Sequence, residues 1–360
     1  MVQKKVGVLG ATGSVGQKFI LLLSEHPDFE LYKLGASSRS AGKKFADAVK
    51  WRQTATIPAK AQPLVVVECV ASEFKDCDVV FSGLDSDVAG DVEKAFAEAG
   101  LVVISNAKNY RQDPQVPLVV PLVNTAHLDM VIERQAAATA AGKPKPGYIV
   151  CISNCSTAGL VVPLAALQAS FGPLDSVFVT TMQAISGAGF SPGVAGFDIL
   201  DNVIPYISGE EDKLETETQK ILGSYQDGAF ALQSDIRVSA QCNRVAVSDG
   251  HLACVSLKFV RQPAPSLDEV KACLAAFECE PQQLGCFSAP KHTMYVLEEP
   301  DRPQPRLDRS RDDGYAVSVG RVRPDNILDY KFVVLAHNTI IGAAGSGVLI
   351  AETLLAKGAL

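Results

Sequence analysis

The sequence predicts an α/β fold in two parts, a Rossmann-like parallel-sheet domain followed by an α+β domain with a mixed, largely antiparallel sheet. Three observations predict it. The chain has 360 residues, and a typical domain size of about 150 residues favours two domains. Short β-branched runs alternate with helical segments in the first half, which is typical of a parallel sheet covered on both faces. Longer strands interrupted by helices follow in the second half.

The first domain takes its strands from five short apolar runs and its helices from the segments between them. We expect these strands at residues 5–10, 31–37, 64–70, 78–84 and 101–107, with helices at 14–26, 86–100 and 125–141. A further strand, YIVCIS at 148–153, follows a segment rich in Pro, Gly and Lys at 142–147. That segment is the best candidate for a domain boundary.

The second domain begins after this strand. Its strands are expected at 176–186, 251–260, 314–322 and 330–336. The chain ends in GSGVLIAETLLAK, a small-residue amphipathic helix. We therefore assign residues 1–153 to the first domain, which residues 338–360 complete, and residues 154–337 to the second.

Composition excludes several classes of function. The net charge of -7 disfavours a protein that binds the phosphate backbone of nucleic acids. Nine scattered cysteines without a CxxC pair indicate neither a disulfide scaffold nor a metal site, and favour a reducing compartment. Glycines interrupt the apolar N-terminus, and polar residues interrupt the apolar stretch 148–167, so neither resembles a signal peptide or membrane span. We expect a cytoplasmic protein that binds no membrane.

Three glycines mark a candidate nucleotide site. Gly10, Gly13 and Gly16 lie on the first strand-to-helix turn, where a backbone without side chains can approach a pyrophosphate beside helix N-terminal amides. Thr12 and Ser14 add hydroxyl donors. Glycine turns also serve packing, but the position after the first strand favours a dinucleotide.

The end of the second strand favours NADP over NAD. An NAD site usually has a carboxylate there to bind the ribose hydroxyls. Here the strand is followed by Ser37, Ser38 and Arg39, and no acidic residue occurs between Glu30 and Asp47. Hydroxyls and a guanidinium suit a 2′-phosphate, although a solvated basic loop would have the same composition.

Cys155 is the candidate nucleophile. It follows a strand and precedes the apolar segment AGLVVPLAAL, which places it near a helix N-terminus, where unpaired amides favour a thiolate. Cys151 lies within the strand and is the alternative, although a buried core position suits it better.

His251 is the candidate partner base. It stands beside Arg244 across a turn at Ser248–Gly250. His337 ends an apolar strand and is the rival. Surface positions are expected for His26, His127 and His292.

Together these segments resemble aspartate-β-semialdehyde dehydrogenase, in the branch typical of archaea and fungi. The resemblance covers nearly the whole chain, and the order and spacing of its motifs are specific. The motifs are VLGATGSVGQKF, GASSRSAGKKF, SNAKNYRQDPQVPLVVPLVN, SNCSTAGL, TTMQAISGAG, IPYISGEEDKLETETQKIL, CNRVAVSDGH and HNTIIGAAGSG.

The resemblance implies a role for each matched residue. Cys155 would be the nucleophile, His251 the general acid/base and Gln183 the residue that orients the acyl group. Arg244 would bind the substrate α-carboxylate, and Arg111 the phosphate. The remaining matches are Asn154, Glu210 and Lys213 for substrate and phosphate, and Gly10, Thr12, Gly13, Ser14, Val15, Ser37, Ser38, Arg39, Ser82, Gly83, Gly187 and Asn338 for the cofactor.

The implied reaction is the NADPH-dependent reduction of L-4-aspartyl phosphate to L-aspartate 4-semialdehyde through a thioester on Cys155. It belongs to the biosynthesis of aspartate-family amino acids, including threonine and methionine. The implied partners are a small-molecule substrate, inorganic phosphate and a second copy of the chain, joined through an apolar patch on strands 174–185 and 252–260. A homotetramer built as a dimer of dimers is the alternative assembly.

Two other classes of protein compete with this interpretation. One is a related acyl reductase: N-acetylglutamyl-phosphate reductase usually has a Pro-Gly-Cys nucleophile, absent here, whereas malonyl-CoA reductase shares most motifs. The other is a non-catalytic NADPH-binding regulator, which typically lacks the nucleophile or its base. Around Cys155 the chain has SNCST in place of the GNCT-type sequence of bacterial members, which supports the archaeal and fungal branch.

Overall fold

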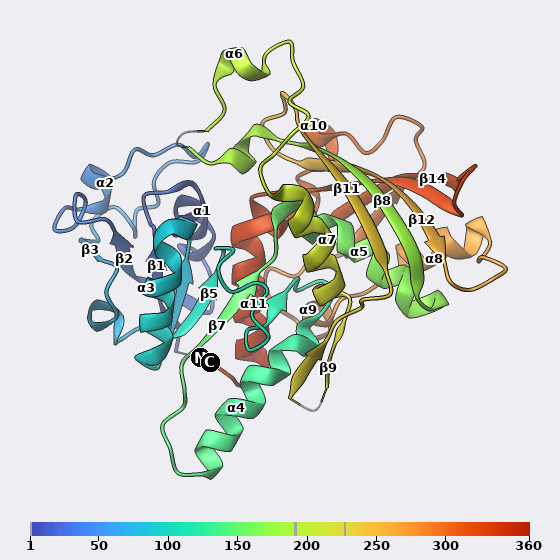
Figure 1. Cartoon of the computed structure of the whole chain (residues 1–360). Helices are drawn as coiled ribbons and strands as arrows, with labels where there is room; N and C mark the ends of the chain where they lie inside the picture. Colours follow the sequence, from blue (N-terminus) through green and yellow to red (C-terminus); the bar gives the residue numbers. More distant parts are fainter. Residues whose placement is uncertain (1, 191–192, 227) are drawn as a thin grey trace.

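The computed structural model describes residues 2–190, 193–226 and 228–360. It contains a seven-stranded sheet and a six-stranded sheet, with α5 (Cys155–Phe171) and α11 (Gly345–Ala356) lying between them (Figure 1). The predicted fold class is confirmed. Among the described residues, no helix is long and apolar enough to cross a membrane.

The seven-stranded sheet is entirely parallel, with the order β3-β2-β1-β4-β5-β7-β6. Its strands are β1 (Lys4–Leu9), β2 (Phe29–Ala36), β3 (Val66–Glu68), β4 (Val79–Ser82), β5 (Val102–Ser105), β6 (Leu118–Val119) and β7 (Tyr148–Ile152). The helices of this part are α1 (Ser14–Leu23), α2 (Phe45–Ala48), α3 (Ser86–Glu98) and α4 (Asp129–Ala140), with 3-10 turns at Ala71–Phe74 and Thr125–Leu128. The strand order reverses between β1 and β4, so a crevice for a ligand is expected at their carboxyl ends.

Alternate residues of the central strands pack on opposite faces of this sheet. Val79 and Phe81 lie in one buried cluster with Phe19 of α1 and Ile350 of α11. Val80 lies in the other cluster, which also holds Phe96 of α3. Both faces are therefore covered, as the continuous apolar strands predicted.

The six-stranded sheet is mixed, with the order β11-β8-β12-β15-β14-β13. Its strands are β8 (Leu174–Gln183), β11 (Arg237–Arg244), β12 (His251–Phe259), β13 (Met294–Leu297), β14 (Val317–Pro324) and β15 (Tyr330–Ala336). The pairs β8–β11 and β13–β14 are parallel and the other three pairs are antiparallel, which confirms a largely antiparallel sheet.

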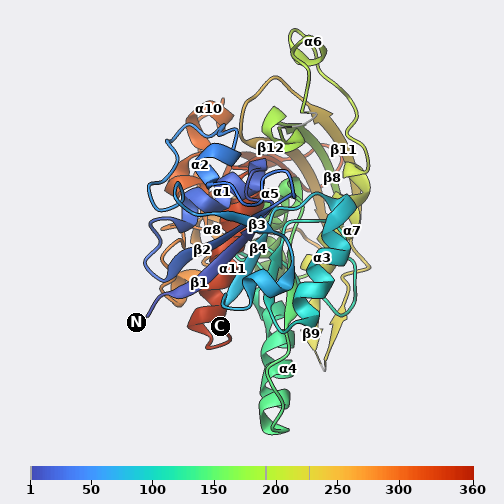
Figure 2. The same cartoon turned by 90° about the vertical axis from the view of Figure 1, so that its left-hand side faces the viewer.

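Several smaller elements complete the second part. Its other helices are α6 (Gly196–Ile199), α7 (Glu210–Ile221), α8 (Leu267–Ala276), α9 (Glu280–Gln283) and α10 (Pro305–Asp308), with 3-10 turns at Ile185–Ala188 and Arg311–Gly314 and a π-turn at Ile340–Ala344. A two-stranded ribbon pairs β9 (Ser224–Gln226) with β10 (Ala229–Ala231). Seen from the side, α4 and α6 extend away from the two sheets at opposite ends (Figure 2).

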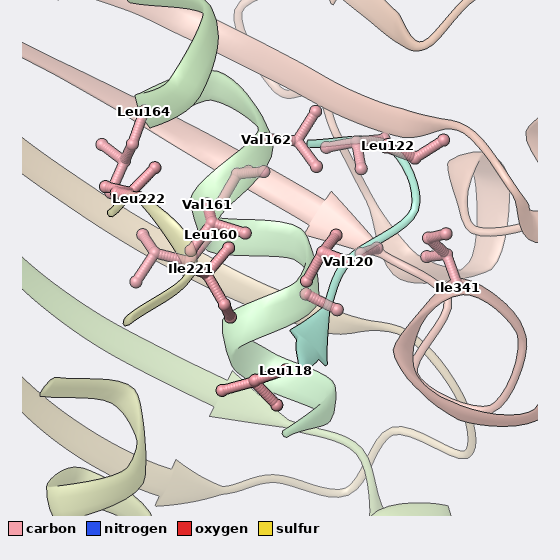
Figure 3. Packing of buried hydrophobic residues seen from close by; sticks show 14 of the residues in the cluster. Leu118, Val120, Leu122, Leu160, Val161, Val162, Leu164, Ile221, Leu222 and Ile341 are labelled. Carbon is pink, nitrogen blue, oxygen red and sulfur yellow. The ribbon is translucent and has the colours of Figure 1, made fainter. Parts of the chain in front are cut away.

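α5 is buried on nearly every side because its sequence is apolar all round. Figure 3 shows its residues Leu160 and Val161 near Ile221 at the end of α7, with Leu118 and Val120 of the parallel-sheet domain close by. This packing holds the N-terminus of α5 against both parts of the chain.

The proposed division into residues 1–153 and 154–337 stays a prediction. One fact supports the return of the C-terminal segment to the first domain, because Val348, Ile350 and Leu354 of α11 share a buried cluster with Phe19 of α1. The other buried cluster contains residues on both sides of the boundary.

The expected surface positions of His26 and His127 are wrong. His26 is 3% exposed, and its Nε2 lies 2.9 Å from Glu352 Oε1 of α11. His127 is 2% exposed, and burial lowers its pKa to about 4. Both rings fill polar positions between elements distant in the sequence, which local pattern cannot show. His292 is exposed as expected.

Candidate active site

The glycine turn lies at the point where the strand order reverses. Gly10 has φ of +70°, and a Cβ on Gly16 would lie 2.1 Å from the Gly10 carbonyl oxygen. A Cβ on Gly10 would lie 2.6 Å from the Gly83 carbonyl oxygen of the neighbouring loop. The two loops at the ends of β1 and β4 therefore touch, and side chains are excluded from both.

The N-terminus of α1 is free to receive an anion. No side chain caps it, and its first turn has no acidic residue. Thr12, Ser14 and Val15 around this turn are half-buried, and the buried hydroxyl of Ser82 has no hydrogen-bond partner among the described residues. Ser37, Ser38 and Arg39 are exposed directly after β2, whose Gly35 carbonyl accepts the Ala11 N–H of the glycine turn at 2.9 Å.

Cys155 begins α5, as expected, and its sulfur lies beside His251. The distance between Cys155 Sγ and His251 Nε2 is 3.2 Å. Asn154 caps the helix, with its Oδ1 accepting from the Ser156 and Thr157 backbone N–H groups at 2.9 and 3.3 Å. The nucleophile and base chosen from the sequence are therefore in contact.

The half-buried Cys155 lies in surroundings that oppose the expected thiolate. Burial, followed by the nearby Glu210 carboxylate, raises the pKa of the Cys155 thiol to about 12, although Arg111, Arg244 and Lys213 oppose this. Two of the helix amides expected to favour the thiolate donate instead to Asn154. In the ligand-free protein these surroundings favour the thiol over the thiolate.

Both ring nitrogens of His251 have a hydrogen-bond partner. Its Nδ1 accepts the Ala184 backbone N–H at 3.0 Å, so the neutral ring has its proton on Nε2, facing the sulfur. Burial, followed by the charge of Arg244, lowers the pKa of His251 to about 3. The resting ring is therefore neutral and donates to Cys155.

Arg244 and Gln183 end two adjacent parallel strands and are register partners. Arg244 Nη1 donates to the Ala184 carbonyl at 2.8 Å. A Cβ on Gly187 would lie 2.9 Å from Arg244 Nη1 and 3.1 Å from His251 Nε2, so this glycine lines the same site. Gln183 is buried, and its amide donates to Thr181 Oγ1 at 3.3 Å rather than to Cys155.

Glu210 and Lys213 are three residues apart on α7 and share a face of this helix. They form an ion pair at 3.0 Å, and the other oxygen of Glu210 accepts from Asn154 Nδ2 at 2.6 Å. The pair therefore contacts the cap of the nucleophile helix and is more than a solvated surface bridge.

Asn338 joins loops on both sides of the site. Its Oδ1 accepts the Gly250 backbone N–H at 2.8 Å, and its Nδ2 donates to Ser186 Oγ at 2.8 Å. These bonds join it to the residues directly before Gly187 and His251, while the His337 side chain takes no part in them. The described residues include no cluster of His, Cys, Asp or Glu that could hold a metal ion.

Known proteins share both halves of this arrangement. Residues 5–131 match the family described as semialdehyde dehydrogenase, NAD binding domain, and residues 164–341 match semialdehyde dehydrogenase, dimerisation domain. The aspartate-semialdehyde dehydrogenase of Candida albicans is 64% identical over 362 residues, which cover 99% of each chain. The chain belongs to the aspartate-semialdehyde dehydrogenase family.

Further relatives support the expected branch of the aspartate-semialdehyde dehydrogenases. The member from the archaeon Archaeoglobus fulgidus is 46% identical, covering 97% of each chain. The crystal structure of the Candida albicans enzyme with NADP superposes with a TM-score of 0.95 at 62% identity, covering 100% of both chains. These relatives support this family over the other acyl reductases and the non-catalytic regulator.

Two residues of the site were not found from the sequence. Glu217 of α7 binds Arg111 Nη1 at 2.9 Å and the Asn154 backbone N–H at 2.6 Å. Lys220 donates to the carbonyls of Arg111, Asp113 and Val116 at 2.8 to 2.9 Å. A seven-residue spacing repeats the Glu210 and Lys213 pair at Glu217 and Lys220, and this signal could have found them.

Proposed function

We propose that this chain reduces L-4-aspartyl phosphate to L-aspartate 4-semialdehyde with NADPH, and oxidises the semialdehyde with NADP and phosphate in reverse. The observation that carries the proposal is the contact between Cys155 Sγ and His251 Nε2 at 3.2 Å, within electrostatic range of Arg111, Lys213 and Arg244. A nucleophile, a ring that can exchange protons and three cations suit an acyl substrate with two anionic groups.

The residues at the carboxyl ends of β1, β2 and β4 fit a dinucleotide. The Gly10 and Gly16 backbone forms a turn that side chains would fill, and the N-cap residue Gly13 gives the α1 amides no side-chain cap. We propose that this turn, with Thr12, Gly13, Ser14, Val15 and Gly83, holds the pyrophosphate side of NADP, and that Ser37, Ser38 and Arg39 hold its 2′-phosphate. Gly187 of the second domain and Asn338, at the start of the C-terminal segment, would also approach the cofactor. When bound, NADPH supplies the hydride.

In the reductive direction the Cys155 sulfur attacks the acyl carbon, and the carbon–oxygen bond to phosphate breaks. The thiol proton must leave the sulfur, and the departing phosphate dianion can accept it. Arg111 and Lys213 stabilise the departing dianion, while Arg244 binds the α-carboxylate and Gln183 orients the acyl oxygen. The thioester that forms on Cys155 is a good acceptor of hydride because thiolate is a good leaving group.

His251 is proposed to move protons at the sulfur and at the substrate oxygen. The Nε2–H that contacts the sulfur in the resting state would also stabilise negative charge on the sulfur when the thiohemiacetal collapses. A second proton would have to reside on Nδ1, where the Ala184 N–H now donates. A substrate carboxylate on Arg244 offsets one cause of the low pKa of His251 and makes this protonation easier.

The proposed assembly is a homodimer, with a dimer of dimers as the finer possibility. Phe178 of β8 and Val260 after β12 are 55% and 59% exposed, within the patch expected to pair with a second copy. We also propose a cytoplasmic location, because all nine cysteines are free and Cys155 must remain a thiol to act.

An assay of the purified chain tests the reaction. We expect NADP reduction that requires both aspartate semialdehyde and inorganic phosphate, and much slower NADPH oxidation in the reductive assay with malonyl-CoA. Absence of phosphate-dependent NADP reduction by the semialdehyde would overturn the proposal. Faster turnover of malonyl-CoA than of aspartate semialdehyde would identify the chain as a malonyl-CoA reductase.

The cofactor preference is tested at Arg39. Replacing it with alanine removes a guanidinium from an exposed loop that we propose holds the 2′-phosphate. Loss of a charge-assisted hydrogen bond is expected to raise KM for NADP about tenfold or more, with KM for NAD unchanged. The control is Lys44→Ala, which removes the same charge from an exposed position of the same loop. Equal effects of both substitutions would identify the segment as a solvated basic loop.

A further inference from the structure

Glu217 is a buried carboxylate to which no role in the reaction has been given. It is 2% exposed, and its two oxygens bind groups from different parts of the chain. Oε1 accepts from Arg111 Nη1 at 2.9 Å, and Oε2 accepts from the Asn154 backbone N–H at 2.6 Å. One side chain therefore spans the candidate phosphate-binding arginine and the residue before the nucleophile.

We propose that Glu217 is a positioning residue that fixes the Arg111 guanidinium relative to the start of α5 and thereby sets the affinity of the site for phosphate. This inference rests on the proposed function of Arg111. Glu217 acts through Arg111 and Asn154, and it contacts neither substrate nor the reacting sulfur.

The contacts of Arg111 show what Glu217 contributes. Glu217 engages Nη1, and the Asn106 carbonyl accepts from Nη2 at 2.8 Å. Nε has no hydrogen-bond partner within the described part of the chain, although it is buried. Two anchors thus orient the planar guanidinium and leave other N–H groups for an oxyanion, which recognises a fixed fork better than a mobile one.

The loop around Arg111 does not depend on Glu217 for its backbone position. Lys220, one turn further along α7, donates to the carbonyls of Arg111, Asp113 and Val116. The loop is therefore attached to α7 independently of the Glu217 ion pair. The role left for Glu217 is to orient the Arg111 side chain and to bind the backbone of Asn154.

Asn154 connects the two glutamates of α7. Its backbone N–H donates to Glu217, its Nδ2 donates to Glu210, and its Oδ1 caps the Ser156 and Thr157 amides. Cys155 follows directly. Glu217 therefore sets the distance between the sulfur and the arginine, since it binds both segments with one rigid carboxylate.

The test measures how phosphate protects Cys155 from iodoacetamide in the purified full-length protein, with the Cys155 peptide quantified by mass spectrometry. Phosphate beside the sulfur excludes the reagent and disfavours the reactive thiolate, so alkylation slows as phosphate binds. We expect Glu217→Gln to raise the half-protecting phosphate concentration at least tenfold. Its amide replaces the carboxylate without adding volume, but cannot accept from both Arg111 and Asn154 in the same way. The control Asp212→Asn, an exposed carboxylate on the same helix, should stay within twofold of wild type.

A second variant and a double-variant cycle separate positioning from folding. Glu217→Asp keeps the buried charge but is too short to reach both partners, so it should weaken phosphate protection as well. With Arg111→Gln already present, Glu217→Gln should add less than a twofold change. In steady-state assays KM for phosphate should rise while KM for NADP does not.

Three results would overturn the proposal: a folded Glu217 variant with wild-type phosphate protection, independent effects of Glu217 and Arg111, or wild-type alkylation that phosphate does not slow. The alkylation measurement needs no turnover. Phosphate protection that depends on Glu217 in a protein without semialdehyde-dependent NADP reduction would therefore retain this inference and reject the proposed reaction.

Discussion

Replacing Cys155 with alanine is expected to lower kcat at least about a thousandfold, because no other group of the site can form the thioester. NADP should bind with unchanged affinity, since the glycine turn lies at the end of β1 and Cys155 lies at the start of α5. The measurements are semialdehyde-dependent NADP reduction and the equilibrium binding of NADP to the same preparation.

The matched control is Cys151→Ala, four residues earlier on β7. Cys151 is fully buried, and burial raises the pKa of its thiol to about 12, as it does for Cys155. The difference between the two cysteines is their surroundings, because only Cys155 has an imidazole at 3.2 Å. Folded Cys151→Ala protein should retain kcat within about threefold. Substantial turnover by Cys155→Ala would assign the nucleophile to another cysteine.

The residues that the sequence could place are those at the ends of elements. Gly10 follows the first strand, Cys155 begins a helix, and Gln183 and Arg244 end neighbouring strands. An abrupt change in periodicity marks each of these positions, and the parallel pairing of β8 with β11 brings the last two together. Motifs at element ends therefore predicted residues that the fold brings close together.

The burial of Glu217 and Lys220 was not predicted from the sequence because it depends on tertiary structure. The α7 sequence EEDKLETETQK is polar apart from Leu214 and is typical of a largely solvated helix. In the structure its Glu217 and Lys220 are each 2% exposed, because the loop after β5 and the start of α5 close over them. Only the pairing of each charge with a specific backbone or side-chain partner makes this burial tolerable, and those partners lie far away in sequence.

The surroundings that disfavour a thiolate at Cys155 could not be predicted from the sequence for a related reason. A position at a helix N-terminus predicts a stabilised thiolate when the first amides are free. Asn154 uses two of those amides, and burial beside Glu210 raises the pKa of the thiol. The sequence showed Asn154 beside Cys155 but could not show where its Oδ1 would bond.

Replacing His251 with glutamine is expected to lower kcat about a hundredfold or more, the usual contribution of a general acid/base. Glutamine retains an amide donor for the sulfur but cannot take up a proton. His251→Ala should cost more, because it also removes the hydrogen bond to Cys155 Sγ. The difference between the two variants separates hydrogen bonding from proton transfer. The control is His337→Asn, at the rival histidine, which should retain kcat within about threefold.

The pH dependence gives the stricter test of His251. An imidazole ordinarily titrates at about 6.5, whereas burial and Arg244 lower the pKa of His251 to about 3 in the ligand-free protein. To accept the hydroxyl proton on Nε2 during oxidation, the ring must be neutral with its own proton on Nδ1 instead of Nε2, so activity is lost as pH falls through its pKa. For kcat/KM, which reports the free enzyme, no inflection from His251 is expected between about pH 5 and 8.

The enzyme–substrate complex should behave differently. If Arg244 binds the α-carboxylate as proposed, the bound carboxylate offsets a charge that disfavours the imidazolium, so the pKa of His251 should rise. The acidic limb of kcat should therefore lie at higher pH than that of kcat/KM, and it should disappear in His251→Gln. If both profiles have the same limb, or if the limb survives the substitution, another group titrates and His251 serves only as a hydrogen-bond donor to the sulfur.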